Sequence, residues 1–169
     1  MKQLFDKVSR QTSENITKTY STSFSWGIYC LDKKFHEPIY GIYGFVRLAD
    51  EIVDSFHGFQ KEKLLADFKK QTYEAIEDGI SLNPVLNSFQ EVVNNYHIDV
   101  ELIETFLQSM EADLTQTVHD EQSIKTYILG SAEVVGLMCL RVFTEGSNEQ
   151  YQDLKESAMR LGAAFQKIN

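Results

Sequence analysis

The segment from Pro38 to Asp54 has the sequence PIYGIYGFVRLADEIVD. Its first nine residues carry no charge, and Arg47, Asp50 and Glu51 then follow within five positions. Proline is well tolerated in the first turn of a helix, where its missing N–H has no partner to lose. Apolar residues at helical spacing run through the same stretch, so the segment predicts one α-helix with an apolar side and an acidic end.

The acids of this segment gather on one side of the predicted helix. At about 100° per residue, Tyr43, Arg47, Asp50 and Asp54 fall on one narrow arc. Asp50 and Asp54 are four residues apart, so their carboxylates are neighbours and repel each other near a helix C-terminus, where negative charge is disfavoured. A bound Mg²⁺ or Mn²⁺ would relieve this repulsion, since both prefer oxygen ligands. For this spacing taken alone, a plain solvated acidic face is the commoner explanation, so the spacing does not decide the function.

The rest of the chain also follows a helical pattern, and we expect no strand. The predicted helices cover residues 2–19, 23–31, 38–55, 61–78, 84–96, 100–118, 124–144 and 151–169. Gly79 is a natural helix stop, Asn83 is an N-cap before a proline, and Ser147 with Gln150 forms a capping box. The last helix is still in pattern at residue 169, so we expect residues 1–169 to be a single helical domain that lacks its C-terminal part.

Composition excludes some classes of function. The chain of 169 residues is long enough for one domain with a sizeable core. Its net charge of −9 makes nucleic acid an improbable partner, because phosphate backbones need a basic face. No apolar run is long enough to span a membrane, and no signal peptide opens the chain. We therefore expect a cytoplasmic protein with at most peripheral membrane contact.

A wider pattern resembles one known family, the phytoene and squalene synthases. The string Tyr43-x-x-x-Arg47-x-x-Asp50-Glu51-x-x-Asp54 is similar to the first aspartate-rich motif of that family, Y-x-x-x-R-x-x-D-D-x-x-D. Four further stretches match in family order: Ser21–Phe24 with S-x-S-F, Met110–Leu114 with M-x-x-D-L, Tyr127–Gly136 with Y-x-x-G-V-A-G-x-V-G, and Leu161–Asn169 with L-G-x-A-x-Q-x-x-N. Each match alone is weak, but five in order are specific, and they cover nearly the whole chain.

The resemblance implies an all-α fold, a helical bundle around a deep central cavity, as in the isoprenoid synthases. It implies two facing aspartate-rich motifs whose Mg²⁺ or Mn²⁺ ions grip substrate diphosphates. In the family the second motif continues past Q-x-x-N as R-D-x-x-x-D, which lies beyond Asn169. Three departures stand within the chain: Glu51 replaces an aspartate, Thr22 stands where many members are basic, and Ser131 with Glu133 replaces valine and glycine.

The resemblance also assigns roles to single residues. It implies catalytic roles for Tyr43, Arg47, Asp50 and Asp54. It implies metal ligation by Asp50, Glu51, Asp54 and Asn169. It implies substrate contacts from Ser21, Ser23, Phe24, Val46, Asp113, Tyr127, Ser131, Gln166 and Asn169. Aromatic residues among them would shield an allylic cation from water and stabilise it through their ring faces.

The implied reaction joins two prenyl diphosphates head to head. We expect geranylgeranyl diphosphate as the substrate, phytoene as the product, carotenoid biosynthesis as the setting, and no nicotinamide cofactor. The alternative within the family is a squalene or dehydrosqualene synthase that uses farnesyl diphosphate. A non-catalytic helical scaffold or an interaction module with an acidic face stays open as a different class. We expect a monomer or a homodimer.

Overall fold

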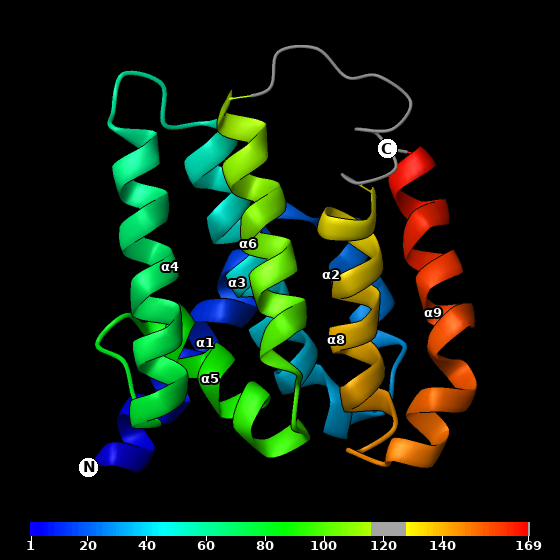
Figure 1. The fold of residues 1–169 in the computed structure, drawn as a ribbon. Helices are drawn as coiled ribbons and strands as arrows, with labels where there is room; N and C mark the ends of the chain where they lie inside the picture. Colours follow the sequence, from blue (N-terminus) through cyan, green and yellow to red (C-terminus); the bar gives the residue numbers. More distant parts are fainter. Residues whose placement is uncertain (116–127, 169) are drawn as a thin grey trace.

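The computed structural model describes residues 1–115 and 128–168, and this part of the chain is helical without a strand (Figure 1). The all-α prediction is therefore confirmed for the described residues. The α-helices are α1 (Lys2–Tyr20), α2 (Thr22–Tyr29), α3 (His36–Asp54), α4 (Lys61–Asp78), α5 (Pro84–Tyr96), α6 (Val100–Thr115), α8 (Val134–Phe143) and α9 (Asn148–Ile168). A 3₁₀ turn, η1 (Lys33–Phe35), precedes α3, and a π-helical turn, η2 (Leu129–Glu133), precedes α8.

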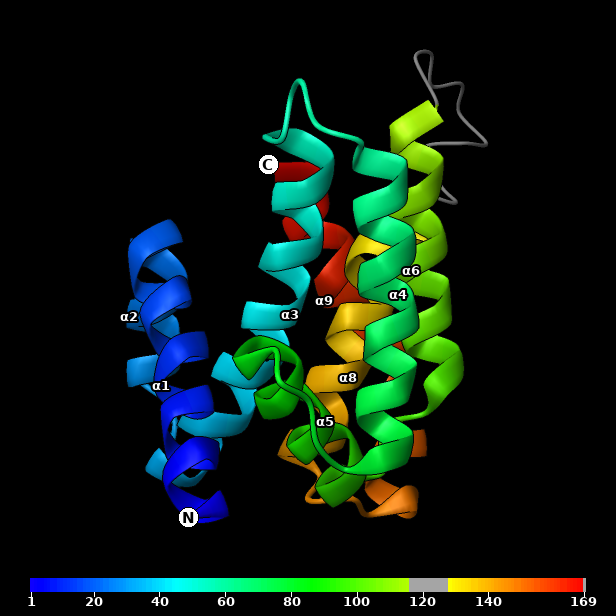
Figure 2. The same ribbon diagram turned by 90° about the vertical axis from the view of Figure 1, so that its left-hand side faces the viewer.

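Helix α3, which carries the acidic motif, lies in the middle of the molecule. It packs against α1, α2, α4, α5, α6 and α8. Figure 2 shows it between α1 and α2 on one side and α4, α6, α8 and α9 on the other. Phe45 is fully buried and stacks on Phe89 at 3.9 Å between ring centroids, with Phe68 and Phe106 each at 5.5 Å. This aromatic core fixes the helix whose next turns carry the acids.

Several helix ends lie where the local chemistry predicts them. Asn83 caps α5, because its Oδ1 accepts hydrogen bonds from the amides of Val85 and Leu86. Gly79 ends α4 with a left-handed φ of 67°, which costs glycine little. The amide of Gln150 donates to Ser147 Oγ at 3.5 Å, so α9 begins at the predicted cap.

Three helix starts differ from the predicted ranges, and one of them is that of α9, which begins at Asn148 and not at residue 151. Ser21, rather than a later residue, caps α2 by accepting the Phe24 amide at 3.2 Å, so α2 starts at Thr22. Helix α3 starts at His36, directly after η1, and Pro38 is its third residue. Pro38 still lies in the first turn, where no intrahelical acceptor is lost.

The predicted helix 124–144 is not a regular α-helix in its described part. Residues Leu129–Glu133 form a π turn, and α-helical geometry resumes at Val134. Neighbouring helices press on this turn from two sides: a Cβ on Gly130 would lie 2.6 Å from Ser109 Cβ, and one on Gly162 would lie 2.6 Å from the carbonyl oxygen of Ala132. The turn is therefore a product of close packing by α6 and α9, and π turns of this kind are frequent at functional sites.

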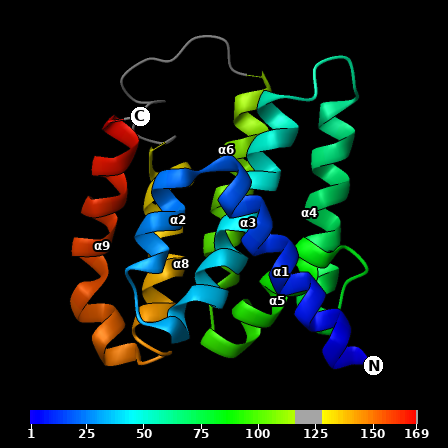
Figure 3. The same ribbon diagram turned by 180° about the vertical axis from the view of Figure 1, so that it is seen from behind.

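Helices α1 and α2 form the outer layer on the face seen in Figure 3. Helix α2 packs mainly against α1 and α3. In the part of the chain that the structure describes, no helix has the length and apolar character needed to cross a bilayer.

Candidate functional site

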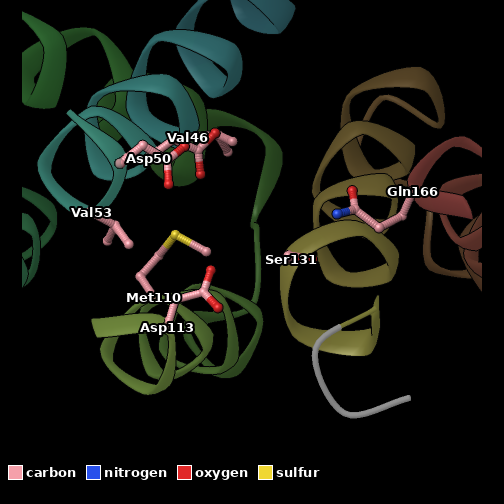
Figure 4. A pocket seen from close by; sticks show the side chains of 8 residues that line it. Val46, Asp50, Val53, Met110, Asp113, Ser131 and Gln166 are labelled. Atoms are coloured by element: carbon pink, nitrogen blue, oxygen red, sulfur yellow. The ribbon is translucent and has the colours of Figure 1, made fainter. Parts of the chain in front are cut away.

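The acidic end of α3 borders a cavity of about 220 Å³ (Figure 4). Its lining comes from four elements: Val46, Asp50, Val53 and Asp54 from α3, Met110 and Asp113 from α6, Ser131 from η2, and Gln166 from α9. Asp50 and Asp54 line it together because they lie one helical turn apart. Predicted site residues from four of the five matched stretches therefore meet here. These stretches are the aspartate-rich string Tyr43–Asp54, Met110–Leu114, Tyr127–Gly136 and Leu161–Asn169.

Asp50 and Asp113 enter the cavity from facing helices. Figure 4 shows both carboxylates pointing into the space between α3 and α6, with the Gln166 amide on the far side. Gln166 reaches this position because Gly162, one turn earlier on α9, lets the helix approach the backbone of η2. Ser131 lies on the π turn itself. The cavity thus combines acidic acceptors on one side with a neutral polar group on the other.

The carboxylates around the cavity lie close enough together to disfavour one another's ionisation. Burial raises the pKa of Asp50 to about 7, against an ordinary 3.8. Arg47 opposes this rise, and the nearby carboxylates of Asp54, Asp113 and Glu51 add to it. A carboxyl pushed so far toward its neutral form is typical of functional sites. Binding of a proton or of a cation would neutralise the negative charge of the Asp50 carboxylate.

Arg47 and Glu51 pair with each other. The Arg47 guanidinium donates from Nη2 to Glu51 Oε2, and it lies over the Tyr20 ring at 4.6 Å from the centroid. Hydrogen bonding to Arg47 lowers the pKa of Glu51 despite its partial burial. Glu51 is paired with Arg47 and is not among the residues that line the cavity, and its predicted role as a metal ligand stays a prediction.

The predicted substrate-binding residues of the stretch Ser21–Phe24 gather beside α3, and they do not line the cavity. The Phe24 ring lies 5.2 Å from the Tyr43 ring between centroids, and Ser21 lies near the Tyr43 hydroxyl, where it lowers the pKa of Tyr43 against the larger rise from burial. Ser21 Oγ and Ser23 Oγ are 3.4 Å apart at the start of α2. Burial raises the pKa of Tyr43, so its hydroxyl stays protonated near neutral pH. Tyr43 in this group is near enough to both Arg47 and Asp50 on α3 to feel their charges.

Two predicted site residues, Tyr127 and Asn169, lie outside the described residues. Two lining residues were missed by the sequence analysis, Val53 and Met110. A signal for each was present: Val53 is three residues after Asp50 on the same helix, and Met110 opens the motif that contains Asp113. Both are apolar, and they supply the dry wall that makes Asp50 hard to ionise.

The donor chemistry of the cavity fits a hard divalent cation. Asp50, Asp54 and Asp113 offer carboxylate oxygens, the ligand type that Mg²⁺ and Mn²⁺ prefer. Within residues 1–115 and 128–168, no group of three or more His, Cys, Asp or Glu side chains is arranged so that it could hold a metal ion by itself. Such a spread of acids suits an ion that keeps several waters or takes phosphate oxygens as its remaining ligands.

Comparison with known proteins identifies the chain. The model of the family described as squalene/phytoene synthase matches residues 17–169. The chain belongs to the squalene/phytoene synthase family. Membership confirms the resemblance seen in the five motifs, and all but the first sixteen residues lie within the matched region.

Relatives within the squalene/phytoene synthase family carry several names. The chain is 28% identical over 169 residues to presqualene diphosphate synthase of Zymomonas mobilis, covering 98% of this chain and 56% of the relative. It is 24% identical to 4,4'-diapophytoene synthase of Staphylococcus haemolyticus, covering 94% and 55%. It is 22% identical to phytoene synthase of Mycobacterium bovis, covering 93% and 50%. The chain thus spans about half the length of the curated relatives it matches.

Solved structures of the squalene/phytoene synthase family show the same fold. The chain superposes on a dehydrosqualene synthase with a TM-score of 0.81 at 23% identity, over 95% of this chain and 55% of that one. It superposes on a squalene synthase from Alicyclobacillus acidocaldarius with a TM-score of 0.82 at 17% identity, over 95% and 59%. The predicted isoprenoid synthase fold is therefore confirmed for the part of it that this chain forms.

Proposed function

We propose that this chain supplies an aspartate-lined, Mg²⁺-dependent cavity to an enzyme that condenses two prenyl diphosphates head to head. The observation that carries the proposal is the meeting of Asp50 and Asp54 with Asp113 around one cavity, in a member of the squalene/phytoene synthase family. The motif order supports the same reaction class.

Asp50 and Asp54, one helical turn apart on α3, are the residues that would hold the cation, and Asp113 faces them across the cavity. When bound, Mg²⁺ supplies positive charge that offsets the negative charge developing on a departing diphosphate. The protein's own contribution is to keep these oxygens on stiff helices, with apolar Val53 and Met110 beside them to exclude water. Asp50 must lose its proton to serve as a ligand, since a protonated carboxyl binds cations poorly.

The size of the cavity limits what it holds. Its 220 Å³ is below the roughly 300–1,000 Å³ of pockets that enclose whole drug-sized ligands. We therefore assign it to the diphosphate end of a substrate, with the hydrocarbon tail outside it. Phe24 and Tyr43 offer an aromatic surface next to α3 on which an allylic cation could be stabilised by ring faces.

Arg47, Gln166 and Ser131 take orienting roles in this proposal. The Nε of Arg47 is buried without a hydrogen-bond partner, so the guanidinium has a donor left beyond its pair with Glu51. Gln166 and Ser131 face the acids across the cavity and can bond oxygens without adding charge. Because Glu51 is engaged with Arg47, we propose that it holds the guanidinium in place rather than a metal ion.

For the substrate we propose geranylgeranyl diphosphate, with phytoene as the product. Farnesyl diphosphate is the second candidate, because relatives of similar identity are named diapophytoene and presqualene diphosphate synthases. A direct competition decides between the two: purified protein is incubated with each labelled diphosphate and Mg²⁺, and the hydrocarbon products are separated. We expect phytoene from the longer substrate, and a product from farnesyl diphosphate alone would contradict this choice.

Binding tests the site independently of turnover. We expect the protein to bind a non-hydrolysable prenyl diphosphate analogue by calorimetry only when Mg²⁺ is present, and Asp50→Asn with Asp54→Asn to lose at least tenfold in affinity. Asp67→Asn is the matched control, because Asp67 is an exposed aspartate of α4 outside the cavity lining. Binding without metal, or no binding at all, would favour the scaffold or interaction-module alternative.

A further inference from the structure

Tyr20, the last residue of α1, lies over Arg47 of α3 and has no part in the reaction proposed above. The centre of the Arg47 guanidinium is 4.6 Å from the centroid of the Tyr20 ring. Tyr20 precedes the matched stretch Ser21–Phe24, and it does not line the cavity. The Tyr20 ring is 50% exposed, whereas the Arg47 side chain beneath it is 24% exposed. The ring therefore covers one face of the guanidinium.

The close packing of α1 on α3 brings these two side chains together. A Cβ on Gly44 would lie 2.9 Å from Ser13 Oγ, so the two helices touch here without a large side chain between them. Arg47 follows Gly44, and Tyr20 follows Ser13, at spacings that return to the same face of each helix. Ser13 and Thr17 are fully buried, so the last turns of α1 are held firmly and fix the backbone of Tyr20.

Glu51 and Tyr20 hold Arg47 in complementary ways. Arg47 Nη2 donates to Glu51 Oε2, which is a contact at the edge of the guanidinium, whereas Tyr20 contacts its face. Stacking on an aromatic ring occupies none of the N–H donors of an arginine. Among the described residues, the buried Nε of Arg47 has no hydrogen-bond partner. Arg47 thus keeps donors for a further partner while its orientation is restrained from two sides.

The same three residues lie within electrostatic reach of the cavity. Arg47 contributes most to the lowered pKa of Glu51, and Tyr20 adds a smaller contribution. Arg47 also opposes the burial that raises the pKa of Asp50, so its positive charge acts on the acid that lines the cavity. Any group that fixes the Arg47 guanidinium therefore affects how an anion beside Asp50 is received.

We propose that Tyr20 is a positioning residue for Arg47, and that its ring keeps the guanidinium oriented so that the remaining donors can bind the diphosphate group of a substrate. This inference rests on the proposed function, which supplies the diphosphate. Restraining a long side chain before the substrate arrives removes part of the ordering cost of binding. Covering one face of the guanidinium also keeps water away from it and strengthens its attraction to an anion.

The orientation of Arg47 can be observed without any ligand. The chain contains few arginines, so the side-chain Nε–H region of an NMR spectrum is sparse, and Arg47→Lys identifies the Arg47 signal. Ring currents shield a proton above an aromatic face, so Tyr20→Leu should move this signal downfield, whereas Tyr20→Phe keeps the ring and should leave it nearly in place. Tyr29→Leu is the matched control, because Tyr29 is an exposed tyrosine that contacts Trp26 on α2.

Binding of the non-hydrolysable prenyl diphosphate analogue with Mg²⁺ tests what this orientation does. Tyr20→Leu should weaken binding about fivefold in calorimetry, and Tyr20→Phe less than about twofold, because the ring supplies the contact. In an Arg47→Lys background Tyr20→Leu should cost little more, since the planar group that the ring orients is gone. Tyr29→Leu should bind the analogue like the unmodified protein.

An Arg47 signal that stays in place in Tyr20→Leu would overturn the positioning role. An equal loss of affinity in the Arg47→Lys background would do the same, because Tyr20 would then act on the fold and not through Arg47. An equal loss in Tyr20→Phe would assign the effect to the hydroxyl and overturn the role of the ring. No binding of the analogue by the unmodified protein would instead contradict the proposed function, and the Arg47 signal would still decide whether Tyr20 holds the guanidinium.

Discussion

Asp50→Asn should stabilise the metal-free protein, and by more at pH 8 than at pH 5. In the folded state burial and neighbouring acids raise the pKa of Asp50 to about 7, whereas an ordinary aspartate has 3.8. Between these values the folded protein holds a proton that the unfolded chain has released. Stability therefore falls as pH rises through this window, and the full cost of the ionised carboxylate is present above pH 7.

The two pKa values set the magnitude. From pH 5 to pH 8, ionisation of Asp50 stabilises the unfolded chain by about three multiples of 2.303RT. It stabilises the folded protein by only about one such multiple, because the pKa there is about 7. The difference of about two units, at 1.36 kcal/mol each, is on the order of 3 kcal/mol. The advantage of Asp50→Asn over the unmodified protein should grow by about this amount between the two pH values, since asparagine cannot ionise.

Urea denaturation in the presence of a chelator measures this directly, with unfolding followed by circular dichroism at both pH values. Asp67→Asn serves as the control and should give no pH-dependent gain, because Asp67 is exposed on α4. Adding Mg²⁺ at pH 8 should stabilise the unmodified protein more than Asp50→Asn. An Asp50→Asn gain that is equal at pH 5 and pH 8, or a loss at pH 8, would refute the reasoning.

Two further perturbations test the packing around the site. Gly130→Ala should lower the free energy of unfolding in urea by about 1–3 kcal/mol, because its Cβ would lie 2.6 Å from Ser109 Cβ. Gly27→Ala is the control: a Cβ there meets open space, and the free energy of unfolding should rise by about 0.5–1 kcal/mol. Equal effects of the two substitutions would contradict the packing explanation of the π turn. A double-mutant cycle on Arg47→Met and Glu51→Gln should give a coupling of about 1–3 kcal/mol at pH 7. Since the pair lowers the pKa of Glu51 below its ordinary 4.5, this coupling should be lost as pH falls through that lowered value, and a coupling that stays constant through the whole acid titration of Glu51 would argue against an ion pair.

The sequence predicts the helices of this protein well because the residues that start and end a helix act on backbone groups only a few positions away. A cap such as Asn83 or a stop such as Gly79 acts on the few amides or carbonyls next to it, so no knowledge of the fold is needed. The same holds for the shared face of Asp50 and Asp54, which follows from the helical repeat alone. These features survive in the structure with only small shifts of helix boundaries.

Features that depend on distant contacts could not be predicted in this way. The π turn at Leu129–Glu133 forms where α6 and α9 approach closely, and nothing within those five residues marks it. That Asp113 and Gln166 face Asp50 was available only through the family resemblance, because their separation in sequence exceeds any local rule. Glu51 shows an intermediate case: its spacing of four from Arg47 permits an ion pair, but the same guanidinium also had Asp50 within reach.

The position of α3 at the centre of the bundle has a consequence for how this protein could be re-engineered. With six helices of the described chain packed around it and Phe45 stacked on Phe89, the backbone that carries the acids is tightly held. The repulsion among the carboxylates near Asp50 can then be relieved by binding a proton or a cation, and not by moving α3. Attempts to alter ion preference should therefore vary the opposite walls on α6 and α9, where side chains can be exchanged without disturbing the central helix.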